Sequence, residues 1–394
     1  MPEFHSRFEK IDRRVPIDEH NCAVQFDVTK CKNCTLCRRA CADTQTVLDY
    51  YSLSSTGDMP ICVHCGQCSS ACPFGAIVEV NDVDKVKAAL KDPEKIVIFQ
   101  TAPAVRVGLG EAFGMDPGTF VEGKMVAALR TLGADYVFDT DFGADLTIME
   151  EATELLHRLQ SEEIPIPQFT SCCPAWVEFA ETFYPDLLQH LSSTKSPISI
   201  LSPVIKTYFA QQKNIDPKKI VNVCVTPCTA KKAEIRRPEL SAAGLFWDEP
   251  EIRDTDICIT TRELAQWIQD ENIDFANLED GQFDKAFGEA SGGGRIFGNS
   301  GGVMEAAIRT AYHMFTGRPA PKDFIPFEPV RGLQGVKKAT VIFGHFVLHV
   351  AAISGLGNAR AFIDDLIKND SFEDYSFIEV MACPGGCIGG GGQP

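Results

Sequence analysis

The chain has 394 residues, of which 44% are hydrophobic, so it can form one large domain with a sizeable core and a second, small one. Its formal net charge of −17 argues against nucleic acid as a partner, because binding a polyanion needs a basic face. No apolar run reaches the roughly 18 residues of a membrane span, and the N-terminus lacks the apolar stretch of a secretory signal. We therefore expect a cytoplasmic protein whose 16 cysteines stay reduced and act as metal ligands or reactive thiols.

Residues 27–82 follow an N-terminal extension of residues 1–26 and contain one cysteine pattern twice, Cys-x2-Cys-x2-Cys-x3-Cys. The first run comprises Cys31, Cys34, Cys37 and Cys41, and the second comprises Cys62, Cys65, Cys68 and Cys72. Thiolates three residues apart can bind three corners of an iron–sulfur cube, and the fourth cysteine of each run then binds the other cube. The pattern predicts two 4Fe-4S clusters in a small α+β domain of the bacterial-ferredoxin type, with zinc as the alternative metal.

The exchange of the fourth cysteine gives each cluster a definite ligand set. One cluster takes Cys31, Cys34, Cys37 and Cys72, and the other takes Cys62, Cys65, Cys68 and Cys41. Two neighbouring clusters conduct electrons but do not catalyse a reaction, so the rest of the chain should supply a place where the electrons are used.

From residue 82 onward the sequence alternates between helical and strand patterns. We expect helices over residues 82–91, 123–132, 146–159 and 260–269, and strands over residues 95–100 and 135–139. The last of these helices opens with a capping box, Thr260-Thr-Arg-Glu263. This alternation predicts an α/β catalytic domain with parallel sheets over residues 93–394.

Cysteines return at the C-terminal ends of three apolar runs. Cys172 and Cys173 follow Ile166–Ser171, Cys228 follows Ile220–Pro227, and Cys383 and Cys387 follow Phe377–Ala382. Ligand sites of parallel α/β sheets lie at the C-terminal ends of the strands, so these segments can surround one pocket. The glycines at positions 385, 386 and 389–392 should let the backbone approach a bulky cofactor.

The three segments offer five cysteines, whereas one cube needs four thiolates. If Cys173 is a ligand, Cys172 lies on the other side of the chain and is free to act as an acid–base thiol. The alternative is that these two neighbours are simply buried apolar thiols. Cys22, Cys224 and Cys258 have no assigned role, and we expect them to be buried thiols.

Three segments resemble the signature motifs of the iron-only (FeFe) hydrogenases: Thr170-Ser-Cys-Cys-Pro-Ala-Trp176, Thr226-Pro-Cys-Thr-Ala-Lys231 and Met381 to Pro394. The two-cluster front end is also similar, so the resemblance spans about residues 27–394. It implies an α/β catalytic domain with parallel sheets in two lobes, and reversible reduction of protons to H2 at a six-iron H-cluster. By the resemblance, a third 4Fe-4S cluster is bound by Cys173, Cys228, Cys383 and Cys387. The Cys387 thiolate also bridges to a di-iron unit that carries CO, cyanide and an azadithiolate.

The resemblance also assigns roles around the di-iron unit. Lys231 matches a residue that hydrogen-bonds a cyanide, and Pro103 and Met381 lie beside the unit. Cys172 matches the thiol that passes protons to the bridgehead amine, with a relay through Glu154, Ser192 and Glu151 and with Arg158 beside it. The spacing of Glu151, Glu154 and Arg158 places them on one helix face, and the alternative is a solvated face.

Some positions depart from the family pattern. Thr226 stands where a methionine usually abuts the di-iron unit, and its hydroxyl could bond a carbonyl or cyanide and admit water. Ile198 stands in place of a polar residue, Ala104 in place of a serine, and Ala175 in place of a glycine. These changes keep a second function open, an H2 sensor with slow turnover. A non-catalytic iron–sulfur assembly protein is a third, less favoured hypothesis, because all four ligands and Cys172 are present.

The resemblance implies a set of partners. Besides H2 and protons, these are a ferredoxin-type electron carrier, the maturation proteins of the H-cluster, and a small subunit or other redox subunits. The family often continues for some tens of residues past the Gly-Gly-Gly-Gln-Pro run, whereas this sequence stops at Pro394.

Overall fold

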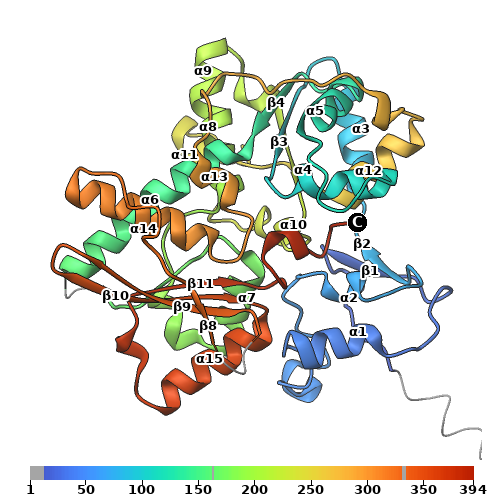
Figure 1. The fold of residues 1–394 in the computed structure, drawn as a ribbon. Coiled ribbons are helices and arrows are strands. Elements are labelled where there is room, and N and C mark those ends of the chain that lie inside the picture. Colours follow the sequence, from blue (N-terminus) through green and yellow to red (C-terminus); the bar gives the residue numbers. More distant parts are fainter. Residues whose placement is uncertain (1–12, 162–163, 331–333) are drawn as a thin grey trace, which may run out of the picture.

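The computed structural model describes residues 13–161, 164–330 and 334–394, so residues 1–12 of the expected N-terminal extension lie outside the described residues (Figure 1). A small front part, blue in Figure 1, lies beside two larger lobes. No helix within the described ranges combines the length and the apolar character that crossing a bilayer requires.

The front part has the predicted α+β character. Its elements are β1 (Val24–Phe26), α1 (Leu36–Arg39), α2 (Gln67–Ser70) and β2 (Ile77–Glu79). The two strands pair antiparallel, and each cysteine run continues from a loop into one of the short helices. Val24, Leu48 and Ile77 form a small core together with Cys37. The cysteines therefore make up a large share of this part's interior.

The first lobe is built on a parallel sheet with the strand order β4-β3-β6-β7. Its strands are β3 (Ile96–Thr101), β4 (Tyr136–Asp139), β6 (Ile220–Thr226) and β7 (Ile257–Thr260). Alternate residues of β3 face opposite sides, as strand geometry requires. Val97 and Phe99 pack with α3 (Val83–Lys91), α5 (Glu122–Thr131) and α12 (Thr261–Asp270). Ile98 packs on the other face with residues of α8 (Pro197–Val204) and of the segment after it.

The second lobe contains a sheet with the order β5-β11-β10-β9-β8. Its strands are β5 (Gln168–Phe169), β8 (Glu328–Pro329), β9 (Val336–Phe343), β10 (Phe346–Ser354) and β11 (Phe377–Met381). The sequence predicts parallel sheets, and β5, β11 and β10 are parallel to one another. However, β9 is antiparallel to its neighbour β10, and β8 is antiparallel to β9. The reason is the two-residue turn at Gly344 and His345, which reverses the chain directly into a hairpin.

Helices cover both faces of this mixed sheet (Figure 1). Residues of α7 (Pro174–Phe183) and α15 (Leu356–Lys368) pack on one face. Residues of α6 (Thr140–Gln160) and α14 (Gly302–Thr316) pack on the other face. The shorter helices are α4 (Val105–Gly108), α9 (Ala210–Lys213), α10 (Lys231–Glu234), α11 (Ala242–Trp247) and α13 (Gly292–Ile296).

Helix α6 joins the two lobes, because it follows β4 of the first sheet and packs on the second. It begins six residues before the predicted start at residue 146. The Asp139 carboxylate caps it by accepting from the Asp141 backbone N–H at 3.0 Å. Gly143 weakens the helical signal of the sequence, but a side chain there would collide with the Pro197 carbonyl of α8. Close packing of α6 against α8 therefore takes precedence over helix propensity.

The other predicted elements agree with the structure within about two residues, except the strand at Ile166–Ser171. That strand shrinks to Gln168–Phe169, because Pro165 and Pro167 have no N–H to donate. The capping box of α12 is confirmed. Thr260 Oγ1 accepts from the Glu263 N–H at 3.1 Å, and Glu263 Oε2 accepts from the Thr260 N–H at 2.7 Å.

Candidate active site

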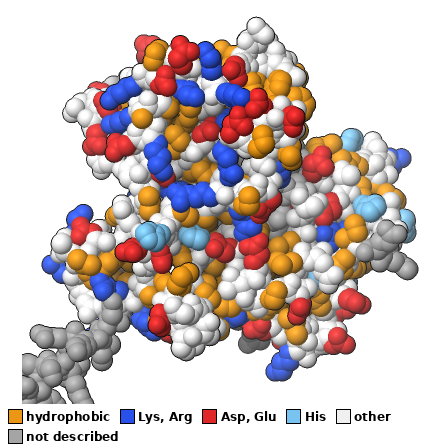
Figure 2. Space-filling view, turned by 180° about the vertical axis from the view of Figure 1, so that it is seen from behind, with side chains coloured by type: hydrophobic (Ala, Val, Ile, Leu, Met, Phe, Trp, Pro, Cys, Tyr) orange, Lys and Arg blue, Asp and Glu red, His pale blue; other side chains and the backbone are white. Residues whose placement is uncertain are grey.

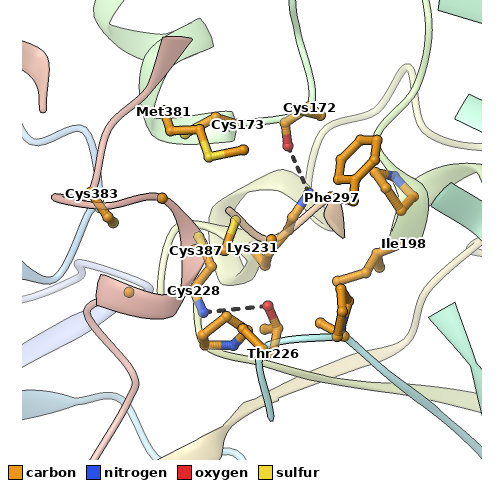
Figure 3. Close-up of a pocket in the computed structure, with 18 of the residues that line it drawn as sticks. Cys172, Cys173, Ile198, Thr226, Cys228, Lys231, Phe297, Met381, Cys383 and Cys387 are labelled. Carbon is orange, nitrogen blue, oxygen red and sulfur yellow. Dashed lines mark hydrogen bonds between the residues drawn. The ribbon is translucent and has the colours of Figure 1, made fainter. Parts of the chain in front are cut away.

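A pocket lies where the C-terminal strand ends of the two sheets meet. The segments after β3, β4 and β6 reach it from the first lobe, and those after β5 and β11 reach it from the second. The pocket is lined by Pro103, Cys172, Cys173, Ile198, Thr226, Cys228, Lys231, Met381, Cys383 and Cys387 (Figure 3). The structure thus brings together all the pocket residues that the sequence predicts, including the five cysteines.

Four of these cysteines form a donor set that fits an iron–sulfur cube. Burial raises the pKa of Cys228 to about 12, and burial together with the neighbouring thiols raises the pKa of Cys383 and Cys387. Cys173 belongs to the same group, because its charge acts on all three. Enclosed thiols that raise one another's pKa are unfavourable as bare thiolates, and bound iron removes that cost by holding them in the charged form.

The four thiols come from three segments on two sheets. Cys173 caps α7 from the N-cap position with Pro174 as the first helical residue, and its sulfur accepts from the Ala382 N–H at 3.4 Å. Among the described residues, no three His, Cys, Asp or Glu side chains are close enough to share a single ion. A cube does not require that closeness, because each of its irons takes one thiolate.

The glycine run at the end of the chain serves close packing more than the sequence predicts. Gly386 lines the pocket with φ near 100°, and a Cβ there would lie 2.8 Å from the Gly298 carbonyl oxygen and 2.9 Å from Met381 Sδ. Gly390 also lines it, but a side chain on Gly391 would collide with the Cys65 carbonyl, and one on Gly392 would collide with Thr260. These last glycines let the chain end pack against the front part and β7, not against a cofactor.

Cys172 differs from the other four thiols because it also faces α6, although it lines the same pocket and the charges of Cys173 and Cys387 act on it. Its side chain packs with Ala144 and Ile148 of α6 and with Phe297, and the residue is 7% exposed. Burial raises the pKa of Cys172 well above its ordinary value, and the charge of Glu151 raises it further. Cys172 is therefore a neutral thiol that faces the helix carrying the predicted relay.

Lys231 supplies the positive charge of the pocket. Its ammonium donates to the Cys172 carbonyl at 3.3 Å and forms an ion pair with Glu234 at 2.7 Å (Figure 3). Burial alone would lower the pKa of Lys231, but Glu234 and Cys228 outweigh it and raise the pKa. The charged ammonium in turn lowers the pKa of Cys173, Cys228 and Cys387 relative to burial alone.

The predicted relay residues lie together, but their order differs from the predicted one. The sequence analysis places Glu154 next to Cys172 and Glu151 at the far end. In the structure Glu151 is fully buried and its charge acts on Cys172, whereas the Glu154 side chain is 14% exposed. The reason is that Glu151 faces the second sheet, where Gln168 Nε2 donates to its carboxylate at 2.7 Å. Residue spacing fixes the helix face but not which end of the relay is inside.

Ser192 lies between the two carboxylates. Its hydroxyl donates to Glu154 Oε2 at 2.8 Å, and it lies close enough to Glu151 to lower the pKa of that carboxyl. Burial raises the pKa of Glu151 to about 8, and the charge of Glu154 adds to this, while Gln168 and Ser192 oppose it. Arg158 holds Glu154 by an ion pair at 2.7 Å and donates its remaining N–H groups to backbone carbonyls. Arg158 therefore positions Glu154.

The front cysteines form two groups with the predicted exchange. Cys31, Cys34, Cys37 and Cys72 line one small cavity. Cys41, Cys62, Cys65 and Cys68 form the other group, because Cys41 and Cys62 contribute to the raised pKa of both Cys65 and Cys68. The second group adjoins the main pocket, because the charge of Cys228 contributes to the raised pKa of Cys65, and the charge of Cys65 contributes to the raised pKa of Cys383.

Hydrogen bonds fasten this junction between the front part and the pocket. Thr229, next to Cys228, donates its hydroxyl to the His64 carbonyl at 2.6 Å. Gln67 Nε2 donates to the Gly389 carbonyl at 2.9 Å. The ligand loop of the inner front cluster is thus tied directly to two ligand segments of the pocket.

Sequence reasoning missed several residues near the pocket. Phe297 and Gly298 line it, and so does Thr140, the first residue of α6. Thr140 could have been found, because it follows directly after the predicted strand at residues 135–139. Phe297 carries no such signal, because it lies in a loop that only the tertiary fold brings close.

The three unassigned cysteines divide into two kinds. Cys224 and Cys258 are buried on adjacent strands, as predicted. Cys22 is only partly buried, and burial would raise its pKa, but a hydrogen bond with His64 and the charges of His64 and Arg236 together outweigh this and lower it. The prediction of a buried thiol was therefore wrong for Cys22, because its partner, His64, lies 42 residues away along the chain.

Comparison with known proteins agrees with this geometry. Residues 95–391 match the family described as "Iron only hydrogenase large subunit, C-terminal domain", and residues 58–78 match the family "4Fe-4S binding domain". The chain belongs to the iron-only hydrogenase family.

Similar proteins include two curated relatives and a solved structure. The chain is 48% identical to "NADP-reducing hydrogenase subunit HndD" of Solidesulfovibrio fructosivorans, over 93% of the chain and 64% of that protein. It is 45% identical to "Iron hydrogenase 1" of Clostridium pasteurianum, over 97% of the chain and 67% of that protein. The fold is similar to that of a variant of apo [FeFe]-hydrogenase HydA1 from Chlamydomonas reinhardtii, with a TM-score of 0.71 and 41% identity over 80% of this chain and 85% of that one. The chain therefore spans about two thirds of these curated relatives.

Proposed function

We propose that the chain reversibly reduces protons to H2 at a six-iron H-cluster, and that two 4Fe-4S clusters pass the electrons. The observation that carries this proposal is the division of labour among the five pocket cysteines. Four thiols form one donor set, while Cys172 faces a buried carboxylate that is linked to the surface. A site that only bound a cluster would need the four thiols but not the fifth.

The cofactor consists of a cube on Cys173, Cys228, Cys383 and Cys387 and a di-iron unit with CO, cyanide and azadithiolate ligands. When bound, it supplies the metal centre at which H2 is formed or split. Lys231 is placed to hydrogen-bond a cyanide, because it keeps its charge and lines the pocket. Pro103 and Met381 limit the space around the unit and keep its surroundings apolar.

The protein's own residues move the protons. Cys172 holds a proton on its sulfur in the pocket, because its raised pKa keeps it neutral. Glu151 can replace that proton, since its carboxyl has a pKa of about 8 and carries a proton at neutral pH. The Ser192 hydroxyl lies between Glu151 and Glu154, which reaches the surface. In this order the three residues outline a route from solvent to the pocket.

The electrons take a different route into the same pocket. Cys31, Cys34, Cys37 and Cys72 would hold the outer front cluster, and Cys41, Cys62, Cys65 and Cys68 would hold the inner one; when bound, the two clusters would supply the sites for electron transfer. The proximity of Cys65 to Cys228 and Cys383 supports this arrangement, because it joins the inner cluster to the pocket cube. Protons and electrons thus enter through different elements of the fold.

The electron partner that we propose is an acidic, ferredoxin-type carrier. Figure 2 shows Lys and Arg side chains gathered in a hollow between the upper lobe and the front part. Lys85, Arg236 and Arg253 line a cavity together with Asp82 and Asp256, and Arg236 is close enough to Cys22 to affect its pKa. Such a basic area on a chain of net charge −17 would attract an acidic surface. Arg236→Gln should slow electron delivery by the carrier but not by a small chemical reductant.

Further partners follow from the same proposal. A six-iron centre requires maturation proteins that build and insert the di-iron unit. The name of HndD, a hydrogenase subunit, supports a small subunit or other redox subunits as partners of this chain as well. We place the protein in the cytoplasm.

The decisive experiment is an infrared spectrum of the protein after maturation with its di-iron unit, together with iron analysis and H2 evolution. We expect carbonyl and cyanide bands and about 14 iron atoms per chain. About eight iron atoms and no such bands after full maturation would overturn the proposal.

An H2 sensor with slow turnover is the second candidate, favoured by Thr226. This residue is 2% exposed, lines the pocket, and accepts from the Cys228 N–H at 3.3 Å, so its own hydroxyl proton remains available (Figure 3). Replacement by Met should shift the carbonyl bands and raise turnover if Thr226 slows the site. If Thr226→Met leaves both bands and rate unchanged, this residue does not touch the di-iron unit, and the sensor hypothesis loses its support.

A further inference from the structure

Thr140 places a hydroxyl at the pocket that the rest of the chain does not use. Thr140 is 1% exposed and lines the pocket together with the predicted site residues. Its Oγ1 atom is buried, and no described residue offers it a hydrogen-bond partner. Leaving a buried hydroxyl unpaired costs free energy, so such groups in folded proteins usually have a partner. The partner of this hydroxyl should be whatever fills the pocket.

The topology of the first sheet separates Thr140 from Thr226. Thr101, at the end of β3, pairs with Asp139 of β4 on one side and with Val225 of β6 on the other. Thr140 and Thr226 therefore leave the sheet on either side of the segment Ala102–Ala104. Because neighbouring strands lie about 4.8 Å apart, the two threonine backbones are about 10 Å apart. Thr140 thus reaches a different part of the bound group from Thr226.

The chemistry of the pocket limits what Thr140 can bind. Much of the pocket lining is apolar and includes Pro103, Ala104, Ile198 and Phe297. A hydroxyl in such surroundings gains most from a compact acceptor that carries partial or full negative charge. The diatomic ligands of the di-iron unit, cyanide and carbonyl, are acceptors of this kind.

We propose that Thr140 Oγ1 donates a hydrogen bond to a diatomic ligand of the di-iron unit and is a further binding residue of the site. The inference rests on the proposed function, since that function supplies the di-iron unit. It adds a second donor beside Lys231, because the Lys231 ammonium, which pairs with Glu234 and donates to the Cys172 carbonyl, has one N–H left for a ligand of the unit.

The test compares three variants by infrared spectroscopy of the matured protein. Thr140→Val removes the hydroxyl with little change in shape, and Thr140→Ser keeps it. Thr101→Val is the matched control, because Thr101 is also fully buried with an unpartnered Oγ1 among the described residues, but it does not line the pocket. We expect Thr140→Val to shift at least one band, Thr140→Ser to stay close to the wild type, and Thr101→Val to leave the spectrum unchanged.

The bands also identify the acceptor. A shift confined to a cyanide band assigns the bond to cyanide, and a shift confined to a carbonyl band assigns it to carbon monoxide. A Thr140→Val spectrum that matches the wild type overturns the inference while the proposed function stands. A wild type without carbonyl or cyanide bands overturns both.

A second measurement distinguishes a binding role from a structural one. In protein that lacks the di-iron unit, Thr140→Val should unfold at the same temperature as the wild type or a higher one, because no hydrogen bond within the chain is lost. A lower unfolding temperature would mean that the hydroxyl has a partner within the protein, and the inference would then be wrong.

Discussion

The front part and the main pocket both gather cysteines, but they do so in opposite ways. In the front part, eight cysteines lie within residues 31–72, on loops and single-turn helices around a small core. In the pocket, four ligands come from segments about 200 residues apart, each fixed at the end of a strand. Electron transfer needs only that clusters lie near one another, whereas bond chemistry needs groups held in a fixed geometry. The more elaborate scaffold therefore surrounds the reacting site.

The front part also has a cysteine that is more exposed to solvent than any of those in the pocket. Cys34 is exposed in the front part, whereas Cys383 is 7% exposed and the other pocket ligands face the cavity. A cluster that exchanges electrons with a partner must lie near the surface. A site that handles protons must instead control which donors reach it, and we propose that Cys172 and the carboxylates behind it do so here.

The largest expected effect separates a predicted pocket ligand from a buried thiol outside the pocket. Cys173→Ala removes one of four thiolates, so the cube and the di-iron unit attached to it should both be lost. Iron content should fall from about 14 to about eight per chain, with no infrared bands and no H2 evolution. Cys224→Ala, at a fully buried thiol on β6, should keep all the iron. Equal iron in the two variants would show that Cys173 is not a ligand.

The next effect separates the fifth cysteine from the other four. Cys172→Ala should keep all clusters and the infrared bands but reduce turnover by about 100-fold or more, because the proton donor in the pocket is gone. Cys172→Asp should recover part of the activity if burial raises the pKa of the new carboxyl. Turnover and iron are measured on the same samples. Wild-type turnover in Cys172→Ala would mean that protons enter by another route.

A smaller effect is expected from a ligand of the front part. Cys34→Ser should disturb the outer cluster while the pocket keeps its infrared bands, because Cys34 lies on an exposed loop remote from the pocket ligands. Turnover with a protein electron carrier should fall several-fold, and turnover with a small chemical reductant should fall less. If the pocket bands disappear as well, the two regions are more strongly coupled than their separate cores indicate.

The smallest effect concerns stability and pH. The pKa of Glu151 is raised from 4.5 to about 8, so its contribution to stability is fully present below pH 4.5 and is lost as the pH rises towards 8. At about 1.4 kcal/mol per unit, the loss is on the order of several kcal/mol. Glu151→Gln should therefore reduce the fall of the unfolding temperature between pH 5 and pH 8.

Two other carboxyls limit this pH effect. Burial raises the pKa of Glu379 and of Asp141 to about 7, so both also make the protein less stable as the pH rises. Part of the fall of the unfolding temperature with pH should therefore remain in Glu151→Gln. The control is Glu150→Gln, at the exposed neighbour on α6, which should keep the wild-type slope. An unchanged slope in Glu151→Gln would show that Glu151 is not neutral in the folded protein at pH 7.

The sequence predicts the members of the site better than their arrangement. Cysteine spacing and the rule that ligands follow strand ends were enough to place five cysteines at one pocket. The order of Glu151 and Glu154 could not be predicted, because helix spacing gives a shared face but not which residue the second sheet covers. The hairpin at Gly344 and the packing role of Gly391 also depend on contacts between distant segments, which local patterns do not record.

Helix α6 has a consequence for how this protein can tolerate insertions. Thr140 at its start lines the pocket, and Glu151 lies 11 residues later, which is about three turns and about 16 Å along the axis. The two residues therefore face nearly the same way, and the helix acts as a spacer of fixed length and direction. One extra residue between them would turn Glu151 by about 100° relative to the pocket without breaking the helix. Loops around the lobes can change length more easily, whereas the number of residues between Thr140 and Glu151 must stay the same to keep both side chains on one face of the helix.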